Sequence, residues 1–455
     1  MKVSWKLGVL GICVAIVTAA FLSGCERPVT QPVPETVPAA PTVVAGSIFP
    51  LRDERGQRCL VDFTGRPFML HGDTAWSLLV QLKREDAERY LEDRHRRGFN
   101  TLLVNLIEHK YAVKAPRNAY GEPPFIEQEN FARPNEKYFA HVDWVLTRAT
   151  QLGFLVLLTP SYLGYEGGDQ GWYSDMRDSG AATLHAYGRY LGMRYRNFKN
   201  IVWMDGGDFA PPQRDLFQAI VDGVRETNPE ALHSFHAARG ISARAYLGNG
   251  AQWLGLNTIY TDENGVVAAA LAEYAASSLP FFLVEARYEG EGATEAVVRA
   301  QAYQAMLSGA CGQLLGNKPV WGFDAGWERA LDSQGARSMT QMRPLMEKFQ
   351  WRQMRPAPDG FIGEGAGTGG DHVAAAISMD GRRIVVYIPS SRNIAIDAAK
   401  LAGSKTTAQW IDPANAKSEP PKALQTGSDS RMRLSPPGQN SSGYNDWLLV
   451  LESTT

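Results

Sequence analysis

Between about residues 65 and 350, short apolar segments alternate with longer segments in which apolar residues recur every three or four positions. The short segments lack strict alternation of apolar and polar residues, which is typical of parallel strands covered on both faces. The longer segments have the spacing of amphipathic helices. The pattern predicts eight strands, at 68–72, 100–105, 154–159, 200–204, 232–236, 255–260, 281–285 and 311–316.

Helices are predicted between these strands, at 84–97, 135–152, 292–308 and 334–350. Asn135 is a suitable N-cap for the second of these, and Gly153 follows its end. Eight strands with intervening helices predict an α/β fold, a (β/α)8 TIM barrel spanning residues 47–354. In this architecture the active site lies at the C-terminal ends of the strands.

The pattern changes after residues 355–358, Arg-Pro-Ala-Pro. No helical spacing follows, and short alternating segments are separated by Gly, Pro, Ser and Asn. These segments lie at 373–379, 383–388, 407–411 and 447–451. Residues 355–455 are therefore predicted to form a small C-terminal β-sandwich.

The N-terminus has the features of a targeting segment. Lys2 and Lys6 precede an apolar run, 7–21, that is shorter than a transmembrane span, and the run is followed by Leu-Ser-Gly-Cys, which resembles a bacterial lipobox. We predict a lipoprotein signal peptide at 1–24, lipidation of Cys25 and a Pro-rich tether over 25–46. The expected location is the bacterial cell envelope, with the lipid anchor at the periplasmic face or outer membrane. An ordinary secretory signal with an incidental Cys is the alternative.

Composition excludes several classes of function. The 46 basic and 48 acidic residues are interspersed and give a net charge of −2, so no basic surface for nucleic acid is predicted. No metal-binding or cofactor-binding motif occurs, and neither a metal nor a cofactor is expected. Cys59 and Cys311 are either free core thiols or one long-range disulfide.

Two carboxylates follow predicted strands and carry the main functional hypothesis. Asp208 follows two glycines after 200–204, and Glu285 ends the apolar run 281–285. Two acids at strand ends suit cleavage of a glycosidic bond. Alternatively, Asp208 caps a helix, and Glu285 is a buried charge that needs a partner. The other strand ends supply candidates for carbohydrate binding: His71, Asp73, Trp76, Asn105, Glu108, Tyr162, Asp205, His236, Tyr260, Tyr288 and Trp321.

Several motifs resemble the apiosidase-like glycoside hydrolases, which are glycoside hydrolase family 140 and its relatives. They are 71–76 (HGDTAW), 98–101 (GFNT), 200–208 (NIVWMDGGD) and Glu285 followed by Tyr288 and Glu289. Residues 355–455 resemble the collagen-binding-type β-domain that often follows that barrel. The resemblance implies a retaining mechanism with Asp208 as acid/base and Glu285 as nucleophile. At 311–316 the chain has CGQLLG where the family commonly has Gly-His-Thr-Tyr-Gly. The resemblance therefore does not predict which sugar is the substrate.

Two other functions compete with hydrolysis. One is a non-catalytic lipoprotein that binds carbohydrate or organises a matrix, and the other is adhesion to a host protein through the β-domain. The distance between the two acids discriminates them, since a separation far beyond about 10 Å excludes a glycosidase mechanism.

Overall fold

The computed structural model describes residues 48–454 except 55, 128–129, 404 and 425–430. The predicted signal peptide, Cys25 and the tether up to residue 46 lie outside the described residues. Within the described part of the chain, no helix is both long enough and apolar enough to cross a membrane.

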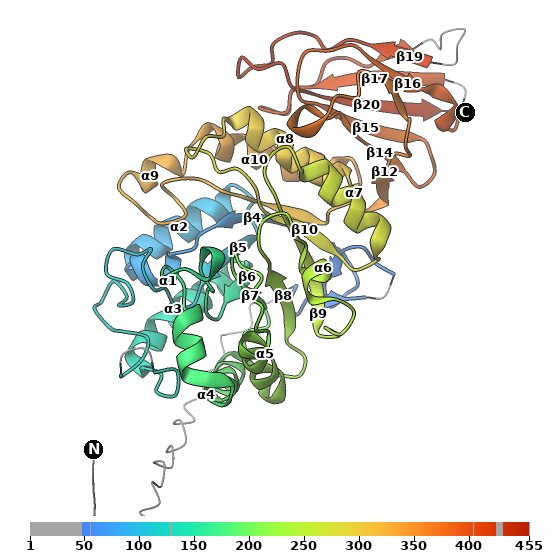
Figure 1. The fold of residues 1–455 in the computed structure, drawn as a ribbon. Helices are drawn as coiled ribbons and strands as arrows, with labels where there is room; N and C mark the ends of the chain where they lie inside the picture. Colours follow the sequence, from blue (N-terminus) through green and yellow to red (C-terminus); the bar gives the residue numbers. More distant parts are fainter. Residues whose placement is uncertain (1–47, 55, 128–129, 404, 425–430, 455) are drawn as a thin grey trace, which may run out of the picture. The chain divides into compact units, whose positions relative to one another are not determined.

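Eight parallel strands form a closed barrel in the order β10-β11-β4-β5-β6-β7-β8-β9 (Figure 1). They differ from the predicted strands by at most two residues at either end, and the predicted TIM barrel is confirmed. The strands are β4 (Leu70–Thr74), β5 (Thr101–Asn105), β6 (Leu155–Thr159), β7 (Ile201–Gly206), β8 (Leu232–His236), β9 (Leu254–Tyr260), β10 (Phe281–Glu285) and β11 (Gly312–Leu315).

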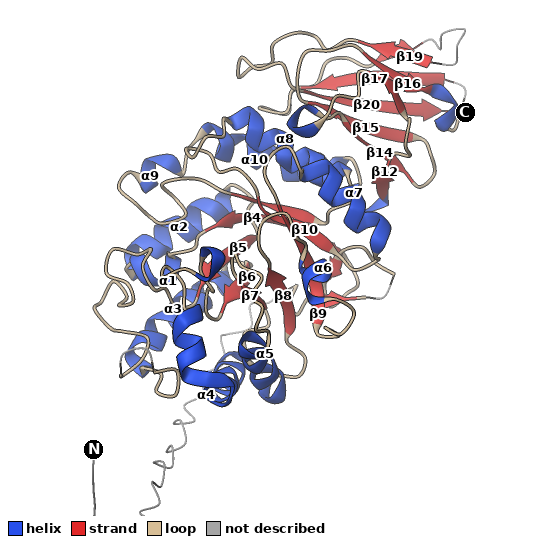
Figure 2. Cartoon of the chain, in the orientation of Figure 1, coloured by secondary structure: helices blue, strands red, loops and turns tan. Residues whose placement is uncertain are grey.

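Helices surround the barrel strands (Figure 2). The Asn135 side chain accepts a hydrogen bond from the backbone of Lys137, so it caps α3 as predicted. The helices are α1 (Leu78–Gln81), α2 (Arg84–Arg96), α3 (Glu136–Gln151), α4 (Tyr173–Tyr195), α5 (Asp215–Thr227), α6 (Ala243–Leu247), α7 (Val266–Ala276), α8 (Glu295–Leu307), α9 (Trp327–Ala330) and α10 (Gln334–Lys348).

Both faces of the strands are buried, which explains their continuous apolar runs. On β5, Leu102 and Val104 pack in the layer between strands and helices. Leu103, between them in sequence, belongs to the cluster inside the barrel with Leu157 and Met204. A strand with apolar partners on both faces has no polar face to alternate with.

A small antiparallel sheet precedes the barrel and was not predicted. Its strands have two residues each, too few to show a period: β1 (Arg52–Asp53), β2 (Leu60–Val61) and β3 (Pro67–Phe68). Cys59 and Cys311 are both buried in the cluster inside the barrel, together with Leu60 and Phe68. Both cysteines are free thiols.

The C-terminal β-domain consists of two antiparallel sheets, as predicted, with an apolar core that includes Ile384, Ile396 and Leu449. The six-stranded sheet has the order β12 (Met354–Pro356), β14 (Ala374–Ser378), β15 (Arg383–Ile388), β20 (Trp447–Thr454), β17 (Lys405–Ile411), β18 (Lys422–Leu424). The three-stranded sheet has the order β13 (Ile362–Glu364), β16 (Ile394–Asp397), β19 (Arg431–Leu434).

A buried ion pair joins helix α8 to the β-domain. The Arg299 guanidinium donates to both carboxylate oxygens of Asp446, at 2.7 and 2.8 Å, and neither side chain is exposed. Asp446 also accepts hydrogen bonds from Tyr387 and Asn440. The carboxylate thus depends on several donors to offset the cost of its burial.

We expect Arg299→Met to lower the free energy of unfolding by about 3–5 kcal/mol, because it leaves the buried Asp446 carboxylate without its cation. The measurement is urea denaturation followed by circular dichroism. Arg383→Met is the matched control, since its partner Glu452 is largely exposed and such pairs contribute under about 1 kcal/mol. Equal losses in the two variants would contradict the role of the buried pair.

Candidate active site

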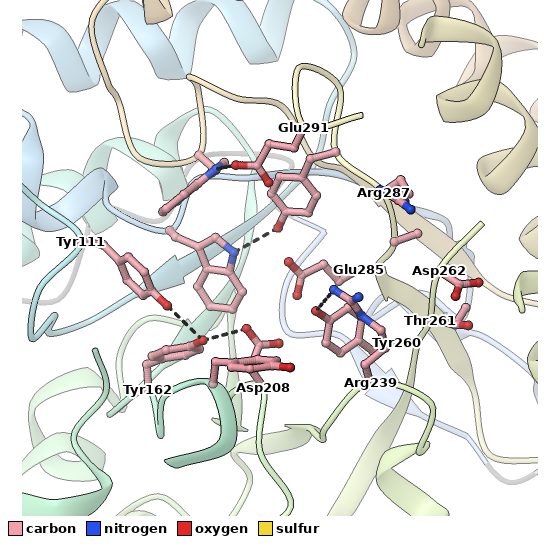
Figure 3. Close-up of a pocket in the computed structure, with 15 residues that line it drawn as sticks. Tyr111, Tyr162, Asp208, Arg239, Tyr260, Thr261, Asp262, Glu285, Arg287 and Glu291 are labelled. Carbon is pink, nitrogen blue, oxygen red and sulfur yellow. Dashed lines mark hydrogen bonds between the residues drawn. The ribbon is translucent and has the colours of Figure 1, made fainter. Parts of the chain in front are cut away.

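Asp208 and Glu285 lie on one pocket at the C-terminal ends of β7 and β10 (Figure 3). A carboxylate oxygen of each lies within 4.8 Å of the other, and a ring nitrogen of His236 lies within the same distance of both. The side chains are 18% and 11% exposed, so substrate can reach groups that are otherwise shielded from water. The barrel therefore brings together two acids that lie far apart in the sequence.

The backbone before Asp208 requires its two glycines. Gly206, Gly207 and Asp208 have φ values of 91°, 126° and 49°, in the region that glycine adopts most readily. A Cβ at Gly207 would lie 2.3 Å from the Tyr162 ring. Asp208 does not cap the next helix, because α5 has Arg214 at its N-cap. The unusual conformation instead turns Asp208 toward the pocket.

Tyrosine hydroxyls hold the Asp208 carboxylate. Tyr162 donates to its Oδ2 at 2.7 Å, and Tyr111 donates to the Tyr162 hydroxyl at 3.3 Å. Oδ1 has no hydrogen-bond partner among the described residues. The carboxyl group is thus anchored through one oxygen, and the other lies 3.9 Å from Nδ1 of His236, beyond hydrogen-bond distance.

The Glu285 carboxylate is held differently. Its Oε2 lies 2.9 Å from Nε2 of His236, and Tyr288 also forms a hydrogen bond with it. Burial raises the pKa of the Glu285 carboxyl, and the charge on Asp208 raises it further, whereas the hydrogen bonds with His236 and Tyr288 oppose the rise. Donors on Glu285 and an unpaired oxygen on Asp208 distinguish the environments of the two acids.

Seven of the 15 residues that line the pocket, which has a volume of about 360 Å³, are aromatic. Flat apolar faces beside a few fixed polar groups suit a ligand with both apolar and hydroxyl-bearing surfaces. The Trp76 indole donates to the Tyr288 hydroxyl at 3.1 Å, and the Trp321 indole donates to Glu291 at 3.2 Å. The rings in the wall are Trp76, Tyr111, Tyr162, Tyr165, Tyr260, Tyr288 and Trp321.

Five of the predicted carbohydrate-binding residues line the pocket: Trp76, Tyr162, Tyr260, Tyr288 and Trp321. The other six lie outside its wall and are at most 2% exposed: His71, Asp73, Asn105, Glu108, Asp205 and His236. In this structure they lie behind the residues that line the pocket.

These six side chains have partners inside the protein. Asp73 forms a buried ion pair with Arg94 at 2.6 Å, and Asp205 lies 2.9 Å from a ring nitrogen of His233. Others in the group are held by neighbouring strands and loops: His71 stacks on Phe99, Asn105 donates to Glu108, Glu108 accepts from Ser77, and His236 contacts Glu285.

Loops supply pocket residues that strand patterns did not indicate. Arg239 donates to the Tyr260 hydroxyl at 3.0 Å, and Arg287 donates to Glu263 at 2.8 Å. Their only sequence signal is a position a few residues beyond a strand. The residues of this kind are Tyr111, Tyr165, Arg239, Thr261, Asp262, Ala286, Arg287 and Glu291.

The fold and the site define a (β/α)8-barrel protein with paired carboxylates in an aromatic pocket. The chain belongs to the apiosidase-like family, since residues 54–353 match the model described as "Apiosidase-like, catalytic domain". Residues 357–452 match the model described as "Putative collagen-binding domain of a collagenase". The resemblance seen in the sequence motifs is therefore confirmed.

Solved structures share the fold. A protein described as "Glycoside hydrolase" aligns with a TM-score of 0.76 and 22% identity, covering 90% of this chain and 99% of that chain. A glycoside hydrolase family 5 protein from Bacteroides vulgatus ATCC 8482 aligns with a TM-score of 0.75 and 22% identity, covering 89% and 93%. No curated protein matches this sequence.

Proposed function

We propose that this protein is a retaining glycoside hydrolase, with Glu285 as nucleophile and Asp208 as acid/base. The observation that carries the proposal is the approach of the two carboxylates, whose oxygens come within 4.8 Å. Retaining enzymes hold their two carboxyl groups about 5–5.5 Å apart, whereas inverting enzymes leave about 6.5–9.5 Å for a water molecule. Family membership and the aromatic pocket support the same reaction class.

The contacts of each acid support its assigned role. In the first step an ionised Glu285 attacks the anomeric carbon while Asp208 gives its proton to the departing glycosidic oxygen. Burial and the Asp208 charge raise the pKa of Glu285, and the donors on its carboxylate favour the ionised form against that rise. The unpaired Oδ1 of Asp208 is available for the proton. In the second step Asp208 takes a proton from water, which attacks the anomeric carbon and releases the sugar with its original configuration.

The proposed substrate is a polysaccharide or a branched oligosaccharide. Aromatic faces in the pocket offer surfaces for sugar rings, and the guanidinium groups of Arg239 and Arg287 lie in the same wall as the acids. The proposed location is the bacterial cell envelope, on the basis of the Leu-Ser-Gly-Cys sequence at residues 22–25. A diacylglyceryl mass on the N-terminal peptide of the mature protein would test that anchor.

The experiment is a screen of the purified protein against plant pectic and bacterial exopolysaccharides, with released sugars identified by mass. We expect release of a sugar that first appears, by proton NMR, with the anomeric configuration it had in the substrate. Activity should persist with a chelator. The inverted anomer would reject the retaining mechanism. Binding in gel retardation without release would favour the non-catalytic alternative.

A further inference from the structure

His236 uses three of its atoms to connect the two acids. It ends strand β8 and its side chain is fully buried. Its carbonyl oxygen accepts from the backbone N–H of Gly207 at 2.8 Å. On the ring, Nδ1 lies 3.3 Å from the backbone nitrogen of Asp208, and Nε2 lies 2.9 Å from Oε2 of Glu285. One residue thus contacts the turn that presents Asp208 and the carboxylate of Glu285.

The hydrogen-bond partners of the His236 ring indicate which of its two nitrogens carries the proton. A backbone N–H can only donate, so Nδ1 must accept for the Asp208 amide to be hydrogen-bonded. Neutral imidazole then has its proton on Nε2, which donates to the Glu285 carboxylate. Both contacts are satisfied by a single tautomer.

A second contact of Nδ1 would favour the alternative in which Nδ1 carries a proton. The Ala237 carbonyl lies 3.2 Å from Nδ1, and this pair becomes a hydrogen bond only if Nδ1 carries a proton. The Asp208 amide would then lose its acceptor, and an unpaired buried N–H is unfavourable. The amide belongs to a residue at φ 49°, a conformation that needs support from its surroundings.

We propose that His236 is the positioning residue for both acids: in its neutral Nε2–H tautomer it fixes the backbone of Asp208 and orients the carboxylate of Glu285. It does not bind substrate, because it lies outside the pocket wall and is covered by Trp76 and Tyr260, whose rings contact it edge-on. The catalytic part of this inference rests on the proposed glycosidase function. The assignment of the tautomer is independent of that function.

The first test needs no substrate. Burial lowers the pKa of His236, but the hydrogen bond with Glu285 and the charge on Asp208 raise it above the ordinary value. Long-range 1H–15N spectra of the full protein, labelled with 15N-histidine and recorded up to about pH 9 to favour the neutral ring, report the tautomer of each ring. The His236 signals are identified by their loss in His236→Asn. We expect the neutral Nε2–H pattern. A neutral ring protonated on Nδ1, or a doubly protonated ring, would overturn the assignment whether or not the protein is a glycosidase.

The second test separates the two contacts with matched variants. In His236→Asn the amide oxygen takes the place of Nδ1 and still accepts from Asp208. No group then replaces Nε2 as a donor to Glu285, which keeps its hydrogen bond with Tyr288. In His236→Gln the amide nitrogen takes the place of Nε2 and still donates to Glu285, but the Asp208 amide loses its acceptor. Misplacement of a reacting group by about 1 Å can cost on the order of 100-fold. We expect each variant to lower kcat by about that factor, with KM changed little.

The step that slows should differ between the variants. With a substrate from the screen, His236→Gln should lose most on poor leaving groups, which need the proton of Asp208, and His236→Asn should lose equally on good and poor ones. His233→Asn is the control, because His233 is also buried on β8 but pairs with Asp205. Equal kcat losses in all three variants, with the same leaving-group dependence, would reduce His236 to a general packing role.

Discussion

We expect Glu285→Gln to lower kcat by roughly 10⁴-fold or more, since it removes the nucleophile and loss of a nucleophile in an enzyme has an effect of this order. The amide has the size of the carboxylate and can still accept a hydrogen bond from Nε2 of His236, which lies 2.9 Å away. Burial already disfavours the charged carboxylate, so the neutral amide should not lower the melting temperature. The measurements are kcat on the substrate from the screen and thermal denaturation.

Glu291→Gln is the matched control for this result. Glu291 lines the same pocket, where it accepts from the Trp321 indole. A change there should affect KM more than kcat, because the role of the side chain is to hold the pocket wall. If Glu285→Gln keeps full turnover while remaining folded, the nucleophile is assigned to the wrong residue.

We expect Asp208→Asn to lower kcat by about 10²–10⁴-fold on substrates with poor leaving groups, the range for loss of a general acid. The loss should be much smaller on an aryl glycoside whose leaving group needs no proton. There the second step becomes limiting, since water lacks its base. Added azide should then restore turnover and form a glycosyl azide of retained configuration, because azide attacks without base assistance.

Asp262→Asn serves as the control for Asp208. Asp262 lines the pocket, and its carboxylate caps the turn that begins α7 by accepting from Asn264 and Gly265. Azide should not accelerate this variant. A glycosyl azide of retained configuration from Glu285→Gln, and none from Asp208→Asn, would show that the two roles are exchanged.

The fold could be predicted from the sequence alone because a strand buried on both faces has a continuous run of apolar residues. Residues 102–104 are continuously apolar, since Leu102 and Leu103 face different apolar clusters. The two acids were also predictable, because parallel strands present their C-terminal ends on one face of a barrel. The two-residue strands β1 to β3 were too short to leave a period.

The roles of the polar residues at those strand ends depended on the tertiary structure. Sequence assigns Asp73, Glu108 and His236 to the same class as Tyr260, since all four follow or end an apolar run. Only the packing of α2 against β4 provides Arg94 as a partner for Asp73.

The pocket residues on loops also depended on the tertiary structure. Arg239 and Tyr111 reach the pocket through the course of their loops, which no periodic pattern records. The sequence by itself thus determined the barrel, the β-domain and the meeting of Asp208 and Glu285 in one pocket, because burial and strand direction are expressed locally. The tertiary structure decided which polar groups line the pocket and which lie behind it, because that depends on contacts between residues distant in the chain, such as His236 and Glu285.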